Sequence, residues 1–246
     1  MAREITHPLL ELNNVHMRYR LGDSVINALD DVSLKVKEGE FISIMGPSGS
    51  GKSTFLQIAS MLAIPTSGEI FLKGREVTGY NEVERARLRN KEIGFVFQQF
   101  NLLPRTSALD NVKLPLVYAR VSEIEQNERA KAMLDEVGLS DRMKNTPAQL
   151  SGGQQQRVAI ARALINDPSI IFADEPTGNL DTKSGQDIME VLIKLHKRGK
   201  TIIMVTHEED IAAVAQREVR FLDGKIVHDS QITKPAHAPR SNKKKK

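Results

Sequence analysis

The chain has 246 residues, of which 40% are hydrophobic and 27% charged, a composition typical of soluble globular proteins. It contains no Cys, which excludes disulfides, cysteine zinc sites and a thiol nucleophile. The absence of Trp and an aromatic fraction of only 4% argue against stacking platforms for single-stranded nucleic acid.

The net charge of +4 comes from one end of the sequence. Six of the 35 Lys and Arg residues lie in 234–246, which has no acidic residue, so the remainder has 29 basic and 31 acidic residues. A basic surface is therefore not a property of the fold, and no nucleic-acid partner is expected. We interpret 234–246 as a disordered tail, with contact to anionic lipid head groups as the alternative.

Residues 1–12 contain acidic residues and a proline where a signal peptide has an apolar core, which argues against a secretion signal. No run of 18 or more apolar residues occurs, so we expect no membrane span. If the protein serves transport, the pore is expected in another chain.

The first part of the chain is predicted to be mainly β-structure. Residues 9–20 and 26–36 show alternation of apolar and polar side chains, which indicates half-buried antiparallel strands. The apolar run 41–45 predicts a buried strand that leads into a glycine-rich loop and a helix over about 53–62. Residues 65–74 are predicted to form a turn and another strand.

From about 80 to 165 the pattern becomes helical, as in 81–90 and in 122–139, where Gly138 is a candidate helix C-cap. Residues 93–104 lie between these segments and predict a strand that breaks into a loop. After 168, strands alternate with helices over 182–197 and 208–216, which is typical of parallel strands joined by crossover helices. Residues 217–229 predict a hairpin that turns at Asp223-Gly224.

Residues 46–53, GPSGSGKS, match the phosphate-binding pattern G-x-x-x-x-G-K-[ST] between a buried strand and a helix, as that motif requires. Gly46, Gly49 and Gly51 allow main-chain N–H groups to curl around phosphate oxygens, and the helix N-terminus adds the positive end of its dipole. Lys52 is expected at the β- and γ-phosphates, and the Ser53 hydroxyl at Mg²⁺. The remaining nucleotide-binding residues predicted in this loop are Ser48, Ser50 and Thr54.

The apolar strand in IIFADEP (170–176) ends in two carboxylates. Asp174, at the C-terminal end of a strand beside the phosphate loop, suits the Mg²⁺ shell. Glu175 is then placed to polarise an attacking water. The alternative is an exposed acidic strand end without a catalytic role.

A second phosphate-binding element is predicted at Ser151, Gly152 and Gly153, which precede an amphipathic helix with Val158, Ala161 and 164–165 on one face. Its N–H donors and hydroxyl form an anion site, and an ordinary Ser N-cap is the alternative. Because the loop at 46–53 already suffices for one nucleotide, the second element makes most sense if it serves a nucleotide held by another copy.

The segment LSGGQ (150–154), with 46–53 and 170–174, resembles the signature, Walker A and Walker B motifs of ATP-binding cassette (ABC) proteins. In that family two subunits pair head to tail, and each signature, here Ser151 to Gln154, closes on the ATP of the other subunit. The resemblance implies four further roles: adenine stacking by Tyr19, Mg²⁺ contact by Gln98 of the Q-loop, crossing of the dimer interface by Asp181 and γ-phosphate contact by His207. For Tyr19 a core position is the alternative.

The resemblance spans about residues 9–230 and implies an α/β fold. Its core is a P-loop NTPase with a mixed sheet and flanking helices, to which an N-terminal antiparallel β subdomain and an inserted α-helical subdomain over about 100–165 are added. Residues 1–233 would then be a single ATPase domain.

Within the family, residues 94–116 resemble macrolide exporters and lipoprotein-release ATPases, and a cell-division ATPase is also similar. The resemblance implies hydrolysis of ATP with Mg²⁺, a second copy as partner, and a separate transmembrane permease subunit at the cytoplasmic face of the inner membrane. One alternative is a regulatory, cell-division type ATPase that moves no cargo. Another is a soluble ABC protein of DNA repair or translation, against which stand the absence of a long coiled-coil insertion, of zinc cysteines and of a second cassette.

Overall fold

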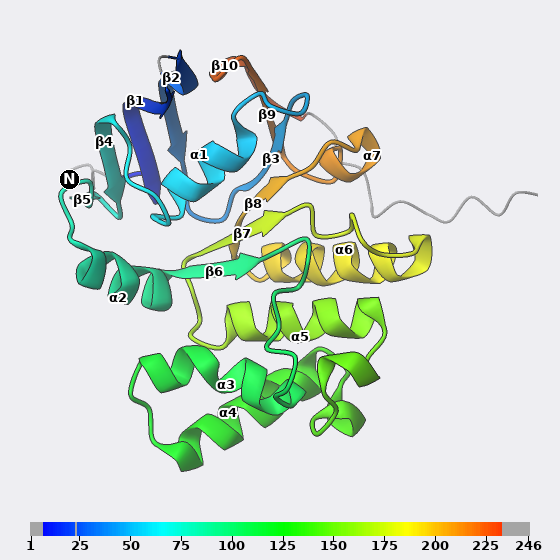
Figure 1. Ribbon diagram of the computed structural model, residues 1–246. Coiled ribbons are helices and arrows are strands. Elements are labelled where there is room, and N and C mark those ends of the chain that lie inside the picture. The colour runs from blue at the N-terminus through cyan, green and yellow to red at the C-terminus, as the bar shows by residue number, and fades with distance from the viewer. Residues whose placement is uncertain (1–6, 23, 233–246) are drawn as a thin grey trace, which may run out of the picture.

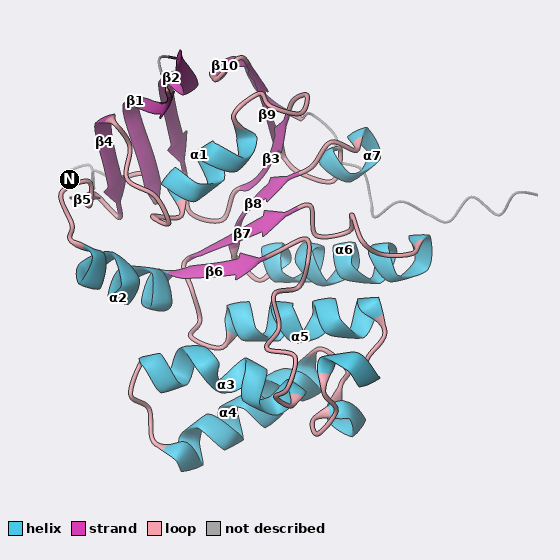
Figure 2. Cartoon of the chain, in the orientation of Figure 1, coloured by secondary structure: helices cyan, strands magenta, loops and turns pink. Residues whose placement is uncertain are grey.

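The computed structural model describes residues 7–22 and 24–232, and the basic segment 234–246 lies outside them. The strands of the described residues are β1 Leu10–Leu21, β2 Ser24–Val36, β3 Phe41–Met45, β4 Ser67–Leu72, β5 Arg75–Glu76, β6 Ile93–Val96, β7 Ile170–Asp174, β8 Thr201–Val205, β9 Arg217–Leu222 and β10 Lys225–Gln231. The α-helices are α1 Lys52–Ala59, α2 Glu82–Glu92, α3 Ala108–Tyr118, α4 Glu123–Glu136, α5 Gly152–Leu164, α6 Thr182–Lys197 and α7 Glu209–Ala212. Figures 1 and 2 show their arrangement.

Two sheets form the upper part of the molecule as drawn in Figure 1. The first has the order β2-β1-β4-β5 and is antiparallel throughout. The second has the order β10-β9-β3-β8-β7-β6, in which all neighbours except β10 and β9 are parallel. The predicted α/β fold with an N-terminal antiparallel part is therefore confirmed.

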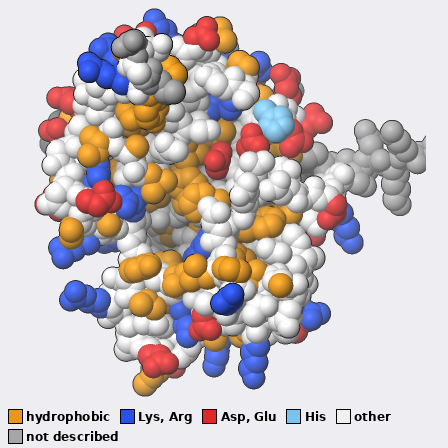
Figure 3. Space-filling view, in the orientation of Figure 1, with side chains coloured by type: hydrophobic (Ala, Val, Ile, Leu, Met, Phe, Trp, Pro, Cys, Tyr) orange, Lys and Arg blue, Asp and Glu red, His pale blue; other side chains and the backbone are white. Residues whose placement is uncertain are grey.

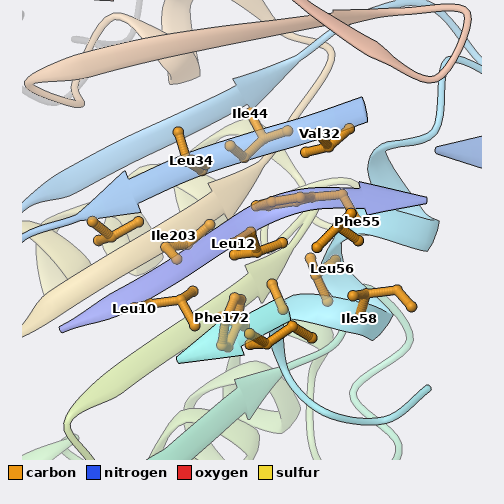
Figure 4. Packing of buried hydrophobic residues seen from close by; sticks show 14 of the residues in the cluster. Leu10, Leu12, Val32, Leu34, Ile44, Phe55, Leu56, Ile58, Phe172 and Ile203 are labelled. Carbon is orange, nitrogen blue, oxygen red and sulfur yellow. The ribbon is translucent and has the colours of Figure 1, made fainter. Parts of the chain in front are cut away.

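Helix α1 is packed between the two sheets. Phe55 and Ile58 on this helix are fully buried in one cluster with Leu12 of the antiparallel sheet and Ile203 of the six-stranded sheet (Figure 4). Burial of each such side chain contributes about 1.5–3 kcal/mol. The packing fixes the N-terminus of α1, which directly follows the glycine-rich loop, relative to the ends of the parallel strands.

The other face of the six-stranded sheet is covered by α5 and α6. Successive residues of β7 point to opposite faces, so Phe172 packs with α1 whereas Ile171 packs in a second cluster with Ile160 of α5. The remaining face of α5, with Val158, Ala161 and Ile165, packs in a third cluster with α3 and α4. Helix α5 is therefore a wall shared by the sheet layer and the helical layer, and Leu164 belongs to its sheet-facing side rather than to the helical cluster.

Several element ends differ from the sequence predictions. Helix α1 ends at Ala59 because the chain turns at Met61, which has a φ of 59°. The helix predicted over 208–216 is only Glu209–Ala212, since Gln216 N already donates to Phe41 O of β3 (2.8 Å). Gly138, with a φ of 70°, closes α4 as predicted. The β9–β10 hairpin turns at Asp223-Gly224 as predicted.

Candidate nucleotide site

A cavity of about 810 Å³ opens at the C-terminal ends of β3, β7 and β8. Ligands of open parallel α/β sheets bind at this edge because the strand ends and the following loops meet there. Ten of the predicted site residues line the cavity: Gly46, Ser48, Gly49, Gly51, Lys52, Ser53, Thr54, Asp174, Glu175 and His207.

The glycine-rich loop is built around the entry to α1. Gly51 is the N-cap of this helix with a φ of 106°, and a Cβ at this position would lie 2.6 Å from Ala28 O. Only glycine therefore allows the loop to pass under β2 in this conformation. The first turn of α1 has no side-chain cap and no acidic residue, so its N–H groups and the positive end of the helix dipole suit an anion.

Lys52 is held across the mouth of the loop. Its Nζ donates to Gly46 O and Pro47 O, each at 2.8 Å, and only 8% of the residue is exposed. Burial lowers the pKa of the Lys52 ammonium, while the charges of Glu175 and Asp174 act in the opposite direction. A ligand anion would supply the countercharge that the two main-chain carbonyls do not.

Two carboxylates and an imidazole meet at the ends of β7 and β8. Burial, followed by the neighbouring charge of Glu175, raises the pKa of the Asp174 carboxyl. Glu175 has a φ of 43°, its N–H donates to Val205 O (2.9 Å), and its Oε1 lies 2.9 Å from His207 Nδ1. A non-glycine residue in the left-handed region next to a ligand cavity is typical of functional sites.

Gln98 lies outside the residues that line this cavity, but its amide faces Glu175 across Gly178. A Cβ at Gly178 would lie 2.8 Å from Gln98 Nε2 and 3.4 Å from Glu175 Oε2. Asn179, the residue after Gly178, holds the main chain at Gln98: its Nδ2 donates to Gln98 O (2.9 Å). The loop at 178–179 therefore sets the approach of the glutamine to the carboxylate.

The signature residues do not enter the cavity of this chain. Ser151 is the N-cap of α5, and its Oγ accepts from Gln154 N while Gln154 Oε1 accepts from Ser151 N. Gly152 and Gly153 pack beside the start of α6: added Cβ atoms would lie 3.3 Å from Leu180 Cδ2 and 2.9 Å from Ser184 Cβ. Among the described residues, the start of α5 is therefore not part of the cavity that the loop at 46–53 lines.

Asp181 is the N-cap of α6 and also lies away from the cavity. Its carboxylate accepts from Lys183 N and Ser184 N, and the Ser184 hydroxyl donates to Oδ2 (2.7 Å). These hydrogen bonds lower the pKa of Asp181, and the one from the Ser184 hydroxyl has the largest effect. In a single chain the residue therefore starts a helix.

Two other predicted binding residues do not line the cavity. Tyr19 is 37% exposed and stands opposite Ile26 in the β1–β2 ladder, and Ile26 itself lines the cavity. Ser50 is 2% exposed, and within residues 7–22 and 24–232 its Oγ has no hydrogen-bond partner. Its side chain lies beneath the loop, where a Cβ on Gly46 would be only 2.7 Å away.

The cavity also includes residues that the sequence did not single out as site residues: Ile26, Asn27, Ala28, Pro47, Val205 and Asp223. Asp223 reaches the site because Gly224 N donates to Ser50 O (3.0 Å), which holds the β9–β10 turn against the phosphate loop. The only local signal was the turn dipeptide, which does not reveal this long-range contact.

Comparison with known proteins agrees with this geometry. A family model described as "ABC transporter" matches residues 29–178. An uncharacterized ABC transporter ATP-binding protein of Thermotoga maritima is 53% identical over 89% of this chain and 93% of its own length. The macrolide export ATP-binding/permease protein MacB of Chlorobium phaeobacteroides is 54% identical over 92% of this chain, which spans only 34% of that protein. The chain thus covers about a third of the macrolide-export relatives that it matches.

A solved structure gives the same result. The dimeric, post-hydrolysis state of the ATP-binding cassette MJ0796, bound to ADP and Pi, superposes with a TM-score of 0.84 at 46% identity, covering 92% of this chain and 99% of that one. The chain therefore belongs to the ABC transporter family and is one of its ATPase cassettes.

Proposed function

We propose that two copies of this chain pair head to tail and hydrolyse MgATP in two shared sites, and that this cycle drives a separate membrane permease subunit. The observation that carries the proposal is the separation of the two phosphate-binding elements. The loop at 46–53 lines the cavity with Glu175 and His207, whereas Ser151 to Gly153 lie outside it at the N-terminus of α5. A dimer in which each signature covers the nucleotide of the other copy uses both elements.

Within one cavity the proposed roles follow from position. Lys52 and the N–H groups at the start of α1 bind the phosphates, and Glu175 takes a proton from the attacking water while His207 orients its carboxylate. Tyr19, beside Ile26, stacks on the adenine. Gln98 approaches from the far side of Gly178. In the dimer, Ser151 to Gln154 contact the partner copy's nucleotide, and Asp181 lies at the interface.

The cavity suits a magnesium ion, since hydroxyl and carboxylate oxygens are the ligands that Mg²⁺ prefers. Ser53 and Asp174 line the same cavity, and Gln98 is the third proposed ligand. Two adjacent carboxylates, one with its pKa raised by burial, are stabilised in their charged form by a divalent cation. When bound, Mg²⁺ would neutralise charge on the transferred phosphoryl group.

A second surface supports a membrane partner. A groove of about 1140 Å³ runs between α2, β6 and the end of α3, where Val83 and Tyr118 expose 58% and 77% of their surfaces. Figure 3 shows apolar side chains gathered in the hollow between the upper and lower parts of the molecule. The groove also includes Phe97, which directly precedes Gln98, so an occupant of the groove would contact the Q-loop.

Among residues 7–22 and 24–232, none of the helices combines the length and the apolar content that a membrane crossing needs. The macrolide-export relatives carry ATP-binding and permease parts in one protein. We propose a separate subunit for the permease, with this chain, as a single ATPase domain over 1–233, at the cytoplasmic face of the membrane.

Site-specific crosslinking tests the proposed partner, because the chain has no native cysteine. Val83→Cys in the groove and Val227→Cys on β10 are matched, each replacing a valine that is 58% exposed. We expect a thiol-reactive photocrosslinker in native membranes to join Val83→Cys, and not Val227→Cys, to an integral membrane protein. Equal labelling of both variants, or capture of a ribosomal or DNA-bound protein by Val83→Cys, would contradict the proposal.

A further inference from the structure

Gln156 is a fully buried polar residue in the middle of the protein, on the second turn of α5. Its side-chain amide leaves its own helix and contacts two other segments. Nε2 donates to Pro176 O at 2.8 Å and to Phe97 O at 3.4 Å. The same NH₂ group therefore ties the end of β6 to the end of β7.

These two carbonyls stand next to the two proposed catalytic side chains. Phe97 directly precedes Gln98, and Pro176 directly follows Glu175. The backbone between the Pro176 carbonyl and the Glu175 side chain is short and stiff. The proline ring restricts φ at 176, and Glu175 occupies a left-handed conformation. A shift of the Gln156 amide would therefore move Gln98 and Glu175 relative to each other.

A second side chain of α5 holds the same loop. The Arg162 guanidinium donates to Phe100 O at 2.8 Å and to Asn101 O at 2.5 Å, and among the described residues it forms no salt bridge. Both of these loop residues have positive φ values, 59° and 49°, so the loop is in a conformation that needs outside support. The Q-loop thus follows the position of α5 over its length from 97 to 101.

The hydrogen bonding of Gln156 is incomplete, which argues against a purely stabilising role. Its Oε1 is buried and has no partner among the residues that the structure describes, although buried polar atoms are nearly always paired. A nonpolar side chain of the same volume would avoid that cost but could not donate to the two carbonyls. What the amide supplies is the link itself.

From this geometry we infer that Gln156 is a positioning residue, which sets Gln98 against Glu175 and makes both follow the helix that begins at the signature residue Ser151. The inference rests on the proposed function, because it takes the roles of Gln98 and Glu175 from there. It adds a route within one chain: a nucleotide held by the partner copy contacts the start of α5, and α5 in turn positions Gln98 and Glu175 in this chain's own cavity.

The test is the effect of Gln156→Met, which keeps the volume and removes both hydrogen bonds, on the full chain. We expect kcat for ATP hydrolysis to fall about 10- to 100-fold, since misplacement by about 1 Å has effects of this size, while the Kd for ATP stays within about twofold. Gln126→Met is the matched control, because the Gln126 amide also donates to a carbonyl (Val121 O, 2.7 Å) but on α4, away from the cavity. Unchanged kcat in Gln156→Met would overturn the inference, as would equal losses of kcat and ATP affinity.

Gln156→Asn covers the case in which the methionine variant does not fold. It keeps the amide but is one methylene shorter, so it cannot reach both carbonyls, and the same loss of kcat at unchanged Kd is expected. Glu175→Gln, assayed in parallel, separates the two ideas. If Glu175→Gln hydrolyses ATP normally, the proposed function fails; if it is inactive while both Gln156 variants keep wild-type kcat, only the positioning role fails.

Discussion

His207 Nδ1 lies 2.9 Å from Glu175 Oε1, although the two residues belong to different strand ends, after β8 and β7. Strand β8 holds both residues: Glu175 N donates to Val205 O at the end of β8, and His207 follows β8 in the chain. The His207 side chain remains 62% exposed and the Glu175 side chain 23% exposed. The histidine is therefore available to a ligand while it holds the glutamate.

Replacing His207 by alanine should leave Glu175 unoriented. We expect kcat to fall about 100- to 1000-fold, as when one preorganised hydrogen-bonding group is removed from a site, with little change in ATP affinity. Phosphate release at saturating ATP and equilibrium nucleotide binding measure the two effects. A loss confined to ATP affinity would show that the histidine only binds.

Glu175→Gln should keep the shape of the site and lose the base. We expect hydrolysis to fall about 100- to 10,000-fold while ATP still binds, so that the ATP-bound head-to-tail dimer accumulates. Size-exclusion chromatography with light scattering in the presence of ATP measures it. Only monomer under these conditions would contradict the shared-site arrangement.

Gly178→Ala should interfere with the approach of Gln98 to Glu175, because the new Cβ would lie 2.8 Å from Gln98 Nε2. Displacement of the amide is expected to lower kcat about tenfold or more and to leave nucleotide binding intact. Gly79→Ala is the control, since a Cβ there meets no atom within 4 Å and its φ is not positive. Equal activity of the two variants would show that the narrow space at 178 is unimportant.

Asp174→Asn should stabilise the nucleotide-free and metal-free protein at neutral pH. Burial raises the pKa of Asp174, so the folded state favours the neutral carboxyl and is penalised once the group ionises. The penalty is absent below the usual Asp pKa of about 3.9, grows as the pH rises toward the raised value, and is complete above it.

Thermal unfolding as a function of pH measures this effect. The Tm of Asp174→Asn should exceed that of the wild type by a few degrees at pH 7, where about 2–4 °C corresponds to 1 kcal/mol in a chain of this size, and the difference should vanish near pH 4. ATP hydrolysis should be lost in the same variant. A lower Tm at pH 7 would mean that Asp174 serves stability rather than the site.

The parts of the site that were predictable are those encoded in contiguous residues. The loop at 46–53, the strand end at Asp174 and Glu175, and His207 after an apolar strand each carry their own local pattern, and parallel strands bring their ends together. The parts that were missed depend on distant contacts. Asp223 lines the cavity only because Gly224 bonds to Ser50, and Asn27 only because β2 crosses the loop.

The fold shows the same division. Alternation identified the strands, and the buried face of β2 contains Leu29, Val32, Leu34 and Val36. The predicted end of α7 was wrong because the hydrogen bond from Gln216 N to Phe41 O of β3 overrides the local helical preference. The inward side chain of Ser50 likewise reflects packing under the loop, which no residue pattern reports.

The central position of β3 has a consequence during synthesis. This strand carries the phosphate loop, yet its two neighbours in the sheet, β8 and β9, are synthesised only after β4 to β7. Until then both of its edges have unpaired N–H and C=O groups, and the nascent chain is exposed to aggregation. The phosphate loop is therefore expected to reach its final conformation only once Gly224 N has bonded to Ser50 O.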